Sequence, residues 1–328
     1  MNNKMCQVSD VIELINAGKS LLIAGDKILL DKLPSGNWIG GTIPYFISEK
    51  GGEFTQERVF ITELPSSAKS FKIVDYDESN LKNIFLDAPE NGFTFLIISA
   101  FSNSHTFYAL NAPSFEHFAS SPVIGWVSGF DLNDSNAKAM VFNGQKSSSS
   151  SNAVAIHVEL PEDKYVDADI INIFEQDKEA DTLQFLEDGF SASEVLVNGQ
   201  KENFINYLKK KNIDTKIPLV ADLFGASINT SFMALDEENN VVKFYAPIFK
   251  NTDYKIGTQI EDYISEFNKK IELLQDKEIS FSCNCILNYL YAGLEGKHTA
   301  NAIGPITFGE IVYQLLNQTM VYMTIEKK

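Results

Sequence analysis

The sequence lacks the features that mark several large classes of protein. No stretch approaches the roughly 20 consecutive apolar residues that a transmembrane helix needs. The N-terminal segment has neither a long apolar core nor a small-residue cleavage site, so we expect no secretory leader. Positive charge is scarce, because 27 Lys and Arg stand against 44 Asp and Glu, for a formal net charge of −17. Such a surface repels phosphate backbones and anionic lipids, which argues against nucleic-acid and membrane partners.

Cysteine is nearly absent. The three cysteines, Cys6, Cys283 and Cys285, form an odd number with no disulfide-framework spacing. On an extended strand the Cα atoms of Cys283 and Cys285 would stand roughly 6.5–7 Å apart, at the outer limit for a disulfide. We therefore expect reduced thiols and a cytoplasmic protein.

Familiar catalytic and metal-binding motifs are missing as well. The sequence contains no H-E-x-x-H, G-x-S-x-G or C-x-x-C pattern, and nothing pairs its histidines as metal ligands. Cys283, His298 and Glu310 together could supply a nucleophile, a base and an orienting group, and they are weak catalytic candidates. A cysteine in the middle of a strand is usually buried and inert, however, and no second cysteine pair completes a zinc site. We expect neither a metal nor a cofactor, and whether the protein is an enzyme stays open.

Apolar residues are abundant. Hydrophobic residues make up 44% of the chain and include 24 Phe and 12 Tyr, which is enough for a large core. Expected strands and helices alternate irregularly and include several hairpins, which favours a mixed α/β fold with mixed sheets. "GFTFLIIS" is typical of a buried strand, and "LLIAG" and "KILL" predict short strands on either side of a turn at Gly25 and Asp26. Alternation in "NAVAIHVEL" places His157 on the more polar face of a strand.

Two glycine-flanked tryptophans are candidates for the apolar wall of a ligand pocket. "GNWIGG" lacks the lysine of a phosphate-binding P-loop and the spacing of a dinucleotide fingerprint, so phosphate binding is not favoured. We instead expect Trp38, with Gly40 and Gly41, to form a pocket wall or lid, the alternative being an ordinary core tryptophan. Trp126, which follows Gly125, has a similar context.

The stretch "IGPITFGEI" near the C-terminus is a glycine- and proline-rich bend followed by a carboxylate. Gly304 and Gly309 would allow a ligand to approach the backbone closely, and Glu310 could bind an amine. The alternative is a turn or bulge whose glutamate is solvated.

The order of motifs resembles the FIST family (F-box and intracellular signal transduction domain) over roughly residues 35 to 326. The matching elements are "VLVNGQ" with the helix after it, "FSC", "FGEI" and "NQT", in that order. The resemblance implies two related lobes of stacked mixed β-sheets flanked by helices. It divides the chain into an N-terminal extension at 1–34, an N-terminal-like lobe at 35–190 and a C-terminal-like lobe at 191–328.

The same resemblance implies a sensor of small metabolites such as amino acids. The ligand would bind between the lobes near Trp126, Cys283, Gly309 and Glu310, where Cys283 matches the family's cysteine. Asn317 of "NQT" joins the candidate ligand-binding residues. The chain has no room for an output domain after the last motif, so we expect a separate signalling partner. The alternatives are a cysteine-dependent enzyme that uses Cys283 and a protein-interaction module.

Overall fold

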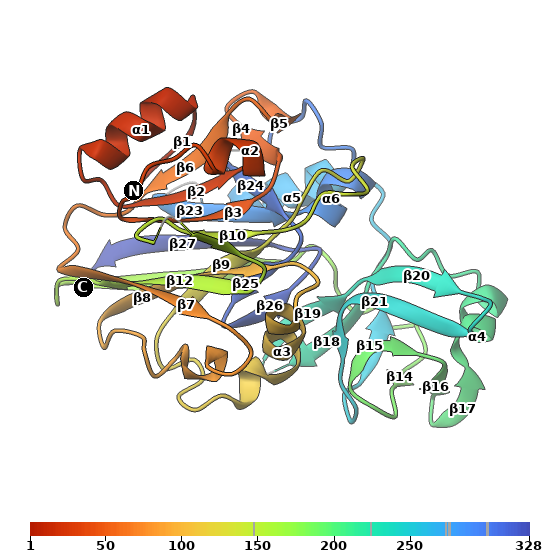
Figure 1. Cartoon of the computed structure of the whole chain (residues 1–328). Coiled ribbons are helices and arrows are strands. Elements are labelled where there is room, and N and C mark those ends of the chain that lie inside the picture. The colour runs from red at the N-terminus through yellow and green to blue at the C-terminus, as the bar shows by residue number, and fades with distance from the viewer. Residues whose placement is uncertain (147, 224, 273, 275–276, 300–301) are drawn as a thin grey trace. The chain divides into compact units, whose positions relative to one another are not determined.

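The computed structural model describes residues 1–146, 148–223, 225–272, 274, 277–299 and 302–328. The fold is mixed α/β, with 43% strand and only 16% helix, so sheets supply most of the core and the predicted fold class is confirmed. The chain forms two compact units (Figure 1). Unit 1 comprises Met1–Ile171, Phe267–Leu315 and Met320–Lys328, and unit 2 comprises Asn172–Glu266 and Leu316–Thr319.

The bounds of these units differ from the contiguous ranges that we expected. β1 (Asn2–Cys6) and β2 (Leu21–Gly25) both pair with β6 (Val59–Glu63), so the segment 1–34 is an integral part of a sheet of unit 1. β27 (Met320–Lys327) pairs with β13 (Lys164–Ile171), which brings the C-terminal strand back to unit 1. Long-range strand pairing of this kind leaves no local sequence signal.

The first sheet of unit 1 has the strand order β1-β6-β2-β3-β10-β11, in which β2 and β3 are parallel. Its other strands are β3 (Trp38–Thr42), β10 (Val141–Asn143) and β11 (Ser148–Ser150), and α1 (Val8–Asn16) packs Val11 and Ile15 into the hydrophobic cluster on one face. The expected strand at "KILL" is wrong, because these residues form helix α2 (Lys27–Leu30). The side chain of Asp26 accepts a hydrogen bond from the backbone N–H of Ile28 (2.9 Å) and thereby caps the helix.

The second sheet has the order β26-β25-β9-β8-β12-β7. It consists of β26 (Gln314–Leu316), β25 (Glu310–Val312), β9 (Val123–Ser128), β8 (Gly92–Ser99), β12 (Ala153–Glu159) and β7 (Ser70–Tyr76). Apolar side chains on one of its faces cluster with those of η1 (Leu81–Asn83), α3 (Asn103–Asn111) and η2 (Ala112–Ser114).

His157 lies on a face of β12 that carries polar groups, since its register partners on the flanking strands are Lys72 and Thr94. Its side chain is buried, and its ring nitrogens lie 3.0 Å from the Tyr76 hydroxyl and 2.8 Å from the Thr94 hydroxyl. These two hydroxyls, on the flanking strands β7 and β8, satisfy the imidazole inside the protein.

The third sheet has the order β13-β27-β23-β24-β4-β5. Its remaining strands are β23 (Ile279–Cys285), β24 (Gly304–Thr307), β4 (Tyr45–Ser48) and β5 (Gly51–Phe54). Helix α6 (Ile286–Tyr291) follows β23 directly, and α5 (Tyr263–Glu272) precedes it. None of the helices in the described part of the chain is long and apolar enough to cross a membrane.

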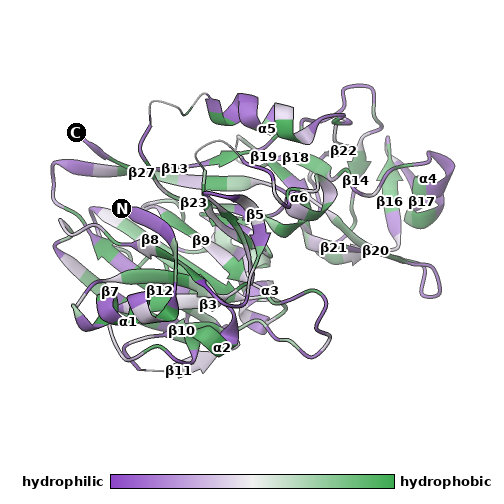
Figure 2. Cartoon of the chain, turned by 90° about the horizontal axis from the view of Figure 1, so that it is seen from above, coloured by the Kyte–Doolittle hydropathy of each residue, from purple (hydrophilic) through white to green (hydrophobic). Residues whose placement is uncertain are grey.

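The three sheets contribute side chains to a shared core. Trp126 of β9 lies 5.2 Å from Phe95 of β8 and 5.8 Å from Phe281 of β23, measured between ring centroids. Phe60 of β6, in the first sheet, lies 6.4 Å from Phe46 of β4, in the third sheet. Figure 2 shows hydrophobic residues (green) concentrated along the strands and hydrophilic residues (purple) along loops and on α5.

Unit 2 has its own hydrophobic core around Phe185, Phe204 and Tyr254. Two sheets build it, in the orders β17-β16-β14-β22-β18-β19 and β15-β21-β20. The strands are β14 (Leu183–Gln184), β15 (Gly189–Ala192), β16 (Glu194–Val197), β17 (Gln200–Asn203), β18 (Leu219–Leu223), β19 (Ala226–Thr230), β20 (Phe232–Asp236), β21 (Val241–Ile248) and β22 (Tyr254–Ile256), with helix α4 (Phe204–Lys210).

Candidate functional site

The predicted residues Trp126, Cys283 and Glu310 come together, but in the interior of unit 1. Trp126 is 1% exposed, Cys283 2% and Glu310 0%. Glu310 lies directly opposite Trp126 across the antiparallel pair of β25 and β9, and the Thr307 hydroxyl donates a 3.2 Å hydrogen bond to its carboxylate. The Cys283 thiol points to the carbonyl oxygen of Gly125, 3.7 Å away. We call these three residues, with Gly41, the core junction.

The chemistry of the core junction does not suit a nucleophile. Burial raises the pKa of the Cys283 thiol well above its ordinary value, and the negative charge of Glu310 raises it further, against a smaller opposing effect of the Thr307 hydrogen bond. His298, the other weak catalytic candidate, is exposed to solvent. All three cysteines are buried and none is in a disulfide, and no group of three or more His, Cys, Asp or Glu among the described residues could hold a metal ion.

The predicted glycines serve close strand packing. A Cβ atom on Gly41 would lie 2.7 Å from the Ile97 side chain and 2.9 Å from Nε1 of Trp126. A Cβ on Gly125 would lie 1.7 Å from the carbonyl oxygen of Leu96. Protein atoms thus occupy the space in which we expect a ligand from the sequence. The same holds for Gly40 and Gly304, whose Cβ atoms would meet backbone oxygens at 2.8 and 1.9 Å, while the Gly309 carbonyl accepts a 2.8 Å hydrogen bond from Val127.

Trp38 and Asn317 are also interior residues. Trp38 stacks on Phe142 with 6.3 Å between ring centroids, and its indole N–H donates a 2.9 Å hydrogen bond to the Pro34 carbonyl. Asn317 belongs to unit 2, where its side-chain oxygen accepts hydrogen bonds from the backbone N–H and the hydroxyl of Ser231, at 3.2 and 2.7 Å. The Trp38 indole N–H and the Asn317 side-chain oxygen are thus engaged within their own units, whereas Nδ2 of Asn317 has no hydrogen-bond partner among the described residues.

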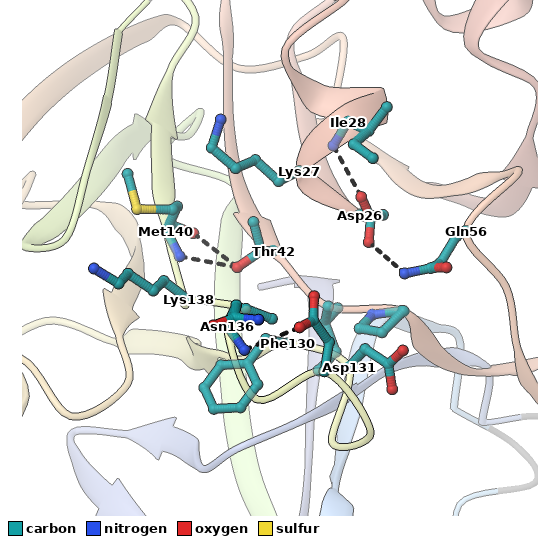
Figure 3. Close-up of a pocket in the computed structure, with 14 residues that line it drawn as sticks. Asp26, Lys27, Ile28, Thr42, Gln56, Phe130, Asp131, Asn136, Lys138 and Met140 are labelled. Atoms are coloured by element: carbon teal, nitrogen blue, oxygen red, sulfur yellow. Dashed lines mark hydrogen bonds between the residues drawn. The ribbon is translucent and has the colours of Figure 1, made fainter.

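A pocket of about 380 Å³ opens elsewhere on unit 1, where β2, β3 and β9 end (Figure 3). Asp26 follows β2, Thr42 closes β3, and Phe130 and Asp131 come shortly after β9. The carboxyl ends of parallel strands such as β2 and β3 are where open α/β sheets commonly bind ligands. The pocket is lined by Asp26, Lys27, Ile28, Thr42, Ile43, Pro44, Gln56, Phe130, Asp131, Asp134, Asn136, Ala137, Lys138 and Met140.

Thr42 holds the floor of this pocket together. Its hydroxyl donates a 2.7 Å hydrogen bond to the Gly129 carbonyl and accepts a 2.9 Å hydrogen bond from the Met140 N–H. The backbone of Thr42 repeats the link, because its carbonyl accepts from Gly129 N–H (2.7 Å) and its N–H donates to the Met140 carbonyl (3.0 Å). Three segments distant in sequence are therefore joined at one buried side chain.

The charged groups in the pocket differ in the interactions that they make with other residues. Both carboxylate oxygens of Asp26 are engaged, one by the N–H of Ile28 and the other by the Gln56 side chain, each at 2.9 Å. Lys27 pairs with Asp31 at 2.6 Å. Lys138, in contrast, is exposed and makes no ion pair with any residue that the structure describes.

In the loop after β9, Asp131 and Asp134 each accept a backbone hydrogen bond through one carboxylate oxygen. Oδ1 of Asp131 accepts a 2.9 Å hydrogen bond from Asn133 N–H, and Oδ1 of Asp134 accepts a 2.9 Å hydrogen bond from Asn136 N–H. These bonds fix the loop, while acidic and basic side chains face one small pocket.

The residues predicted from the sequence include two that lie next to this pocket in the chain but none that line it. Gly40 and Gly41 directly precede Thr42, but Thr42, Asp131 and Lys138 were not singled out. The available signal was a polar residue immediately after an apolar strand, as at Asp26 after "LLIAG" and Asp131 after "GWVSGF". Residues at these positions lie on loops, where binding groups are concentrated.

Comparison with known proteins gives a family but no activity. A search of curated proteins finds no match to the chain. Residues 6–326 match a family of unknown function, DUF6976, which takes in both compact units and the whole pocket lining. The chain therefore belongs to the DUF6976 family.

Proposed function

We propose that unit 1 binds a small zwitterionic molecule, such as an amino acid, in the pocket at the ends of β2, β3 and β9. The observation that carries this proposal is the presence of acidic and basic side chains in one pocket of about 380 Å³. That volume lies within the range of small-molecule sites. The ammonium group of Lys138 would bind the ligand's carboxylate, and Asp131 and Asp134 would bind its amine.

Binding of this kind fits a cytoplasmic sensor or signalling scaffold that acts through a separate partner. The resemblance to the FIST family favours the same class of ligand. Compared with the sequence-based expectation, the proposed ligand moves from a position between two lobes to a pocket within unit 1. Three buried cysteines outside any disulfide are typical of a protein from a reducing compartment.

The cysteine-dependent enzyme is the weaker alternative. It requires a thiolate in contact with a base, and Cys283 is 2% exposed with a raised pKa and an acidic neighbour, Glu310. The protein-interaction module predicts a large exposed apolar patch and no deep pocket, and the pocket of about 380 Å³ counts against it.

A thermal-shift screen tests the proposal. The probes are the L-amino acids, each compared with the matching amine without a carboxylate and the matching acid without an amine. A ligand at 100 times its Kd stabilises the folded protein by about 2.7 kcal/mol. We expect a shift with at least one amino acid and a smaller shift with both of its truncated analogues.

Matched variants locate the binding. Lys138→Gln should abolish the shift, and Lys82→Gln, at an exposed lysine outside the pocket, should preserve it. If no amino acid shifted the transition, or if Lys138→Gln bound as well as the unsubstituted protein, the proposal would be wrong.

A further inference from the structure

Three phenylalanines form an aromatic surface that adjoins the pocket. Phe101, Phe130 and Phe308 lie within 6.5 Å of one another, with centroid distances of 6.3 Å (Phe101–Phe130), 6.5 Å (Phe101–Phe308) and 5.0 Å (Phe130–Phe308). We call them the phenylalanine platform. Phe130 also lines the pocket, as Figure 3 shows, so the platform and the charged groups are continuous.

The platform is assembled from three strand ends. Phe101 follows β8, Phe130 follows β9, and Phe308 lies between β24 and β25. A Cβ atom on Gly129 would lie 2.2 Å from the ring of Phe308, so this ring rests directly on the backbone beside Phe130. The rings therefore have a fixed support beneath them.

Phe101 is the most unusual of the three residues. Its side chain is 59% exposed and its φ is +59°, in the left-handed region that bulky residues rarely adopt. Strain of this kind persists only where the surroundings hold it, and it is concentrated at functional sites. An exposed ring gains nothing for the core, so core packing does not explain why a phenylalanine stands here.

The surroundings do hold this turn. The backbone N–H of Phe101 donates a 3.3 Å hydrogen bond to Nδ1 of His105. Burial lowers the pKa of His105 to about 4, so near neutral pH the ring is uncharged and Nδ1 can accept this bond. Ser102 caps α3 by accepting a 3.0 Å hydrogen bond from the N–H of His105, and its hydroxyl donates a 2.7 Å bond to the Ser99 carbonyl.

Other apolar side chains near the mouth of the pocket are exposed too. Ile28, which lines the pocket, is 67% exposed, and Leu132, next to Asp131, is 45% exposed. A small zwitterion held by Lys138 and Asp131 would leave this apolar surface uncovered unless the ligand carried an apolar group of its own. Aromatic rings pair favourably in offset or edge-to-face geometry at centroid distances like those within the platform.

We infer that the ligand of this pocket carries an aromatic side chain, and that the pocket selects phenylalanine, tyrosine or tryptophan over small amino acids. This inference rests on the proposed function, because the charged groups must first hold the zwitterion. An aromatic amino acid is the ligand class that suits this site, because the phenylalanine platform is continuous with the charged pocket.

Calorimetric titration with L-phenylalanine and L-alanine separates the two claims. We expect L-phenylalanine to bind about tenfold more tightly than L-alanine, the difference that one aromatic contact and its buried area can supply. Phe101→Ala should bring the two affinities to within about twofold, chiefly by weakening the binding of L-phenylalanine. Leu86→Ala removes a comparably exposed apolar side chain outside the pocket and should leave the preference unchanged.

Phe130→Leu is the second variant and should reduce the preference in the same direction, with far-UV circular dichroism to confirm folding of each protein. Equal affinity of the unsubstituted protein for the two amino acids, or a preference that survives both substitutions, would overturn the inference and leave the proposed function standing. Absence of binding by either amino acid would overturn the inference, and with an unresponsive amino-acid screen it would overturn the proposed function too.

Discussion

The core junction and the pocket lie in the same unit and use different kinds of residue. The core junction contains the rare residue types, a tryptophan, a cysteine and a tightly packed glycine, together with a carboxylate that is 0% exposed. The pocket is lined by common residues such as Asp131, Lys138 and Thr42. In this protein the rare residue types lie where side chains and backbone are tightly packed. The common polar residues lie at strand ends, which a ligand can reach.

The two regions also differ in what a substitution should change. Side chains in the core junction are shielded from water, so their replacement acts on the free energy of unfolding. The charged side chains of the pocket are at least partly exposed, so their replacement acts mainly on binding, whereas Thr42 is buried and its replacement acts on both properties. The predictions below test this separation.

Trp126→Ala should have the largest effect. The indole is 1% exposed and contacts Phe95 and Phe281, so its removal leaves a cavity at the meeting point of three sheets. We expect a loss of about 3–5 kcal/mol in the free energy of unfolding, measured by urea denaturation.

Trp126→Phe is the control for this prediction. The Trp126 indole N–H has no hydrogen-bond partner among the described residues, so phenylalanine loses volume without losing a hydrogen bond. The loss in the free energy of unfolding should be clearly smaller for Trp126→Phe than for Trp126→Ala. Equal losses for the two variants would contradict the packing argument.

Acid should destabilise the fold through His157. Burial lowers the pKa of His157 to about 4 in the folded protein, against 6.5 in the unfolded chain. Between these two values the unfolded state binds the additional proton, so stability is full above pH 6.5, falls as the pH drops and levels off below pH 4. The contribution of His157 is about 3 kcal/mol over that range.

Denaturation curves from pH 7 to pH 4 measure this loss. His157→Gln keeps a group that can bond to Tyr76 and Thr94 but does not titrate, so the stability of this variant should depend less on pH. Identical pH dependence for both proteins would show that His157 is not the group responsible.

Thr42→Val should have an intermediate effect on both properties. Valine has nearly the same shape but cannot bond to the Gly129 carbonyl or the Met140 N–H. We expect a loss of about 1–3 kcal/mol in the free energy of unfolding and weaker ligand binding, because the pocket floor loosens. Thr55→Val, at a threonine outside the pocket, is the comparison, and unchanged amino-acid affinity in Thr42→Val would disprove the role of the floor.

Lys138→Gln should leave stability nearly unchanged. The side chain is exposed and has no ion-pair partner in the described part of the chain, so the free energy of unfolding should change by less than about 0.5 kcal/mol. Amino-acid binding should nevertheless be lost. A large loss of stability in this variant would remove the distinction between the two regions.

Elements with a strong local pattern could be predicted from the sequence. The apolar run "GFTFLIIS" forms β8 with the expected bounds. The prediction for "KILL" failed because a lysine followed by three apolar residues fits a strand or a helix equally well. The capping hydrogen bond from Ile28 N–H to the side chain of Asp26 favours the helix.

The candidate site was harder to predict because its parts are brought together by strand pairing. Asp26, Thr42, Asp131 and Lys138 come from segments that only the parallel pairing of β2 with β3 and the Thr42–Gly129 hydrogen bonds make neighbours. Trp126, Cys283 and Glu310 were predicted to be close, and they are close. Their chemical types did not reveal whether the space between them is filled by protein or open to a ligand.

The nesting of unit 2 within the chain has a consequence for biosynthesis. Residues 172–266 leave the ribosome before β23, β25 and β27, which the sheets of unit 1 require. Until then β9 lacks its neighbour β25, and β13 lacks its neighbour β27, so nascent unit 1 presents unpaired strand edges. We expect unit 2 to acquire most of its structure first, and unit 1 to fold slowly and to depend on chaperones during translation.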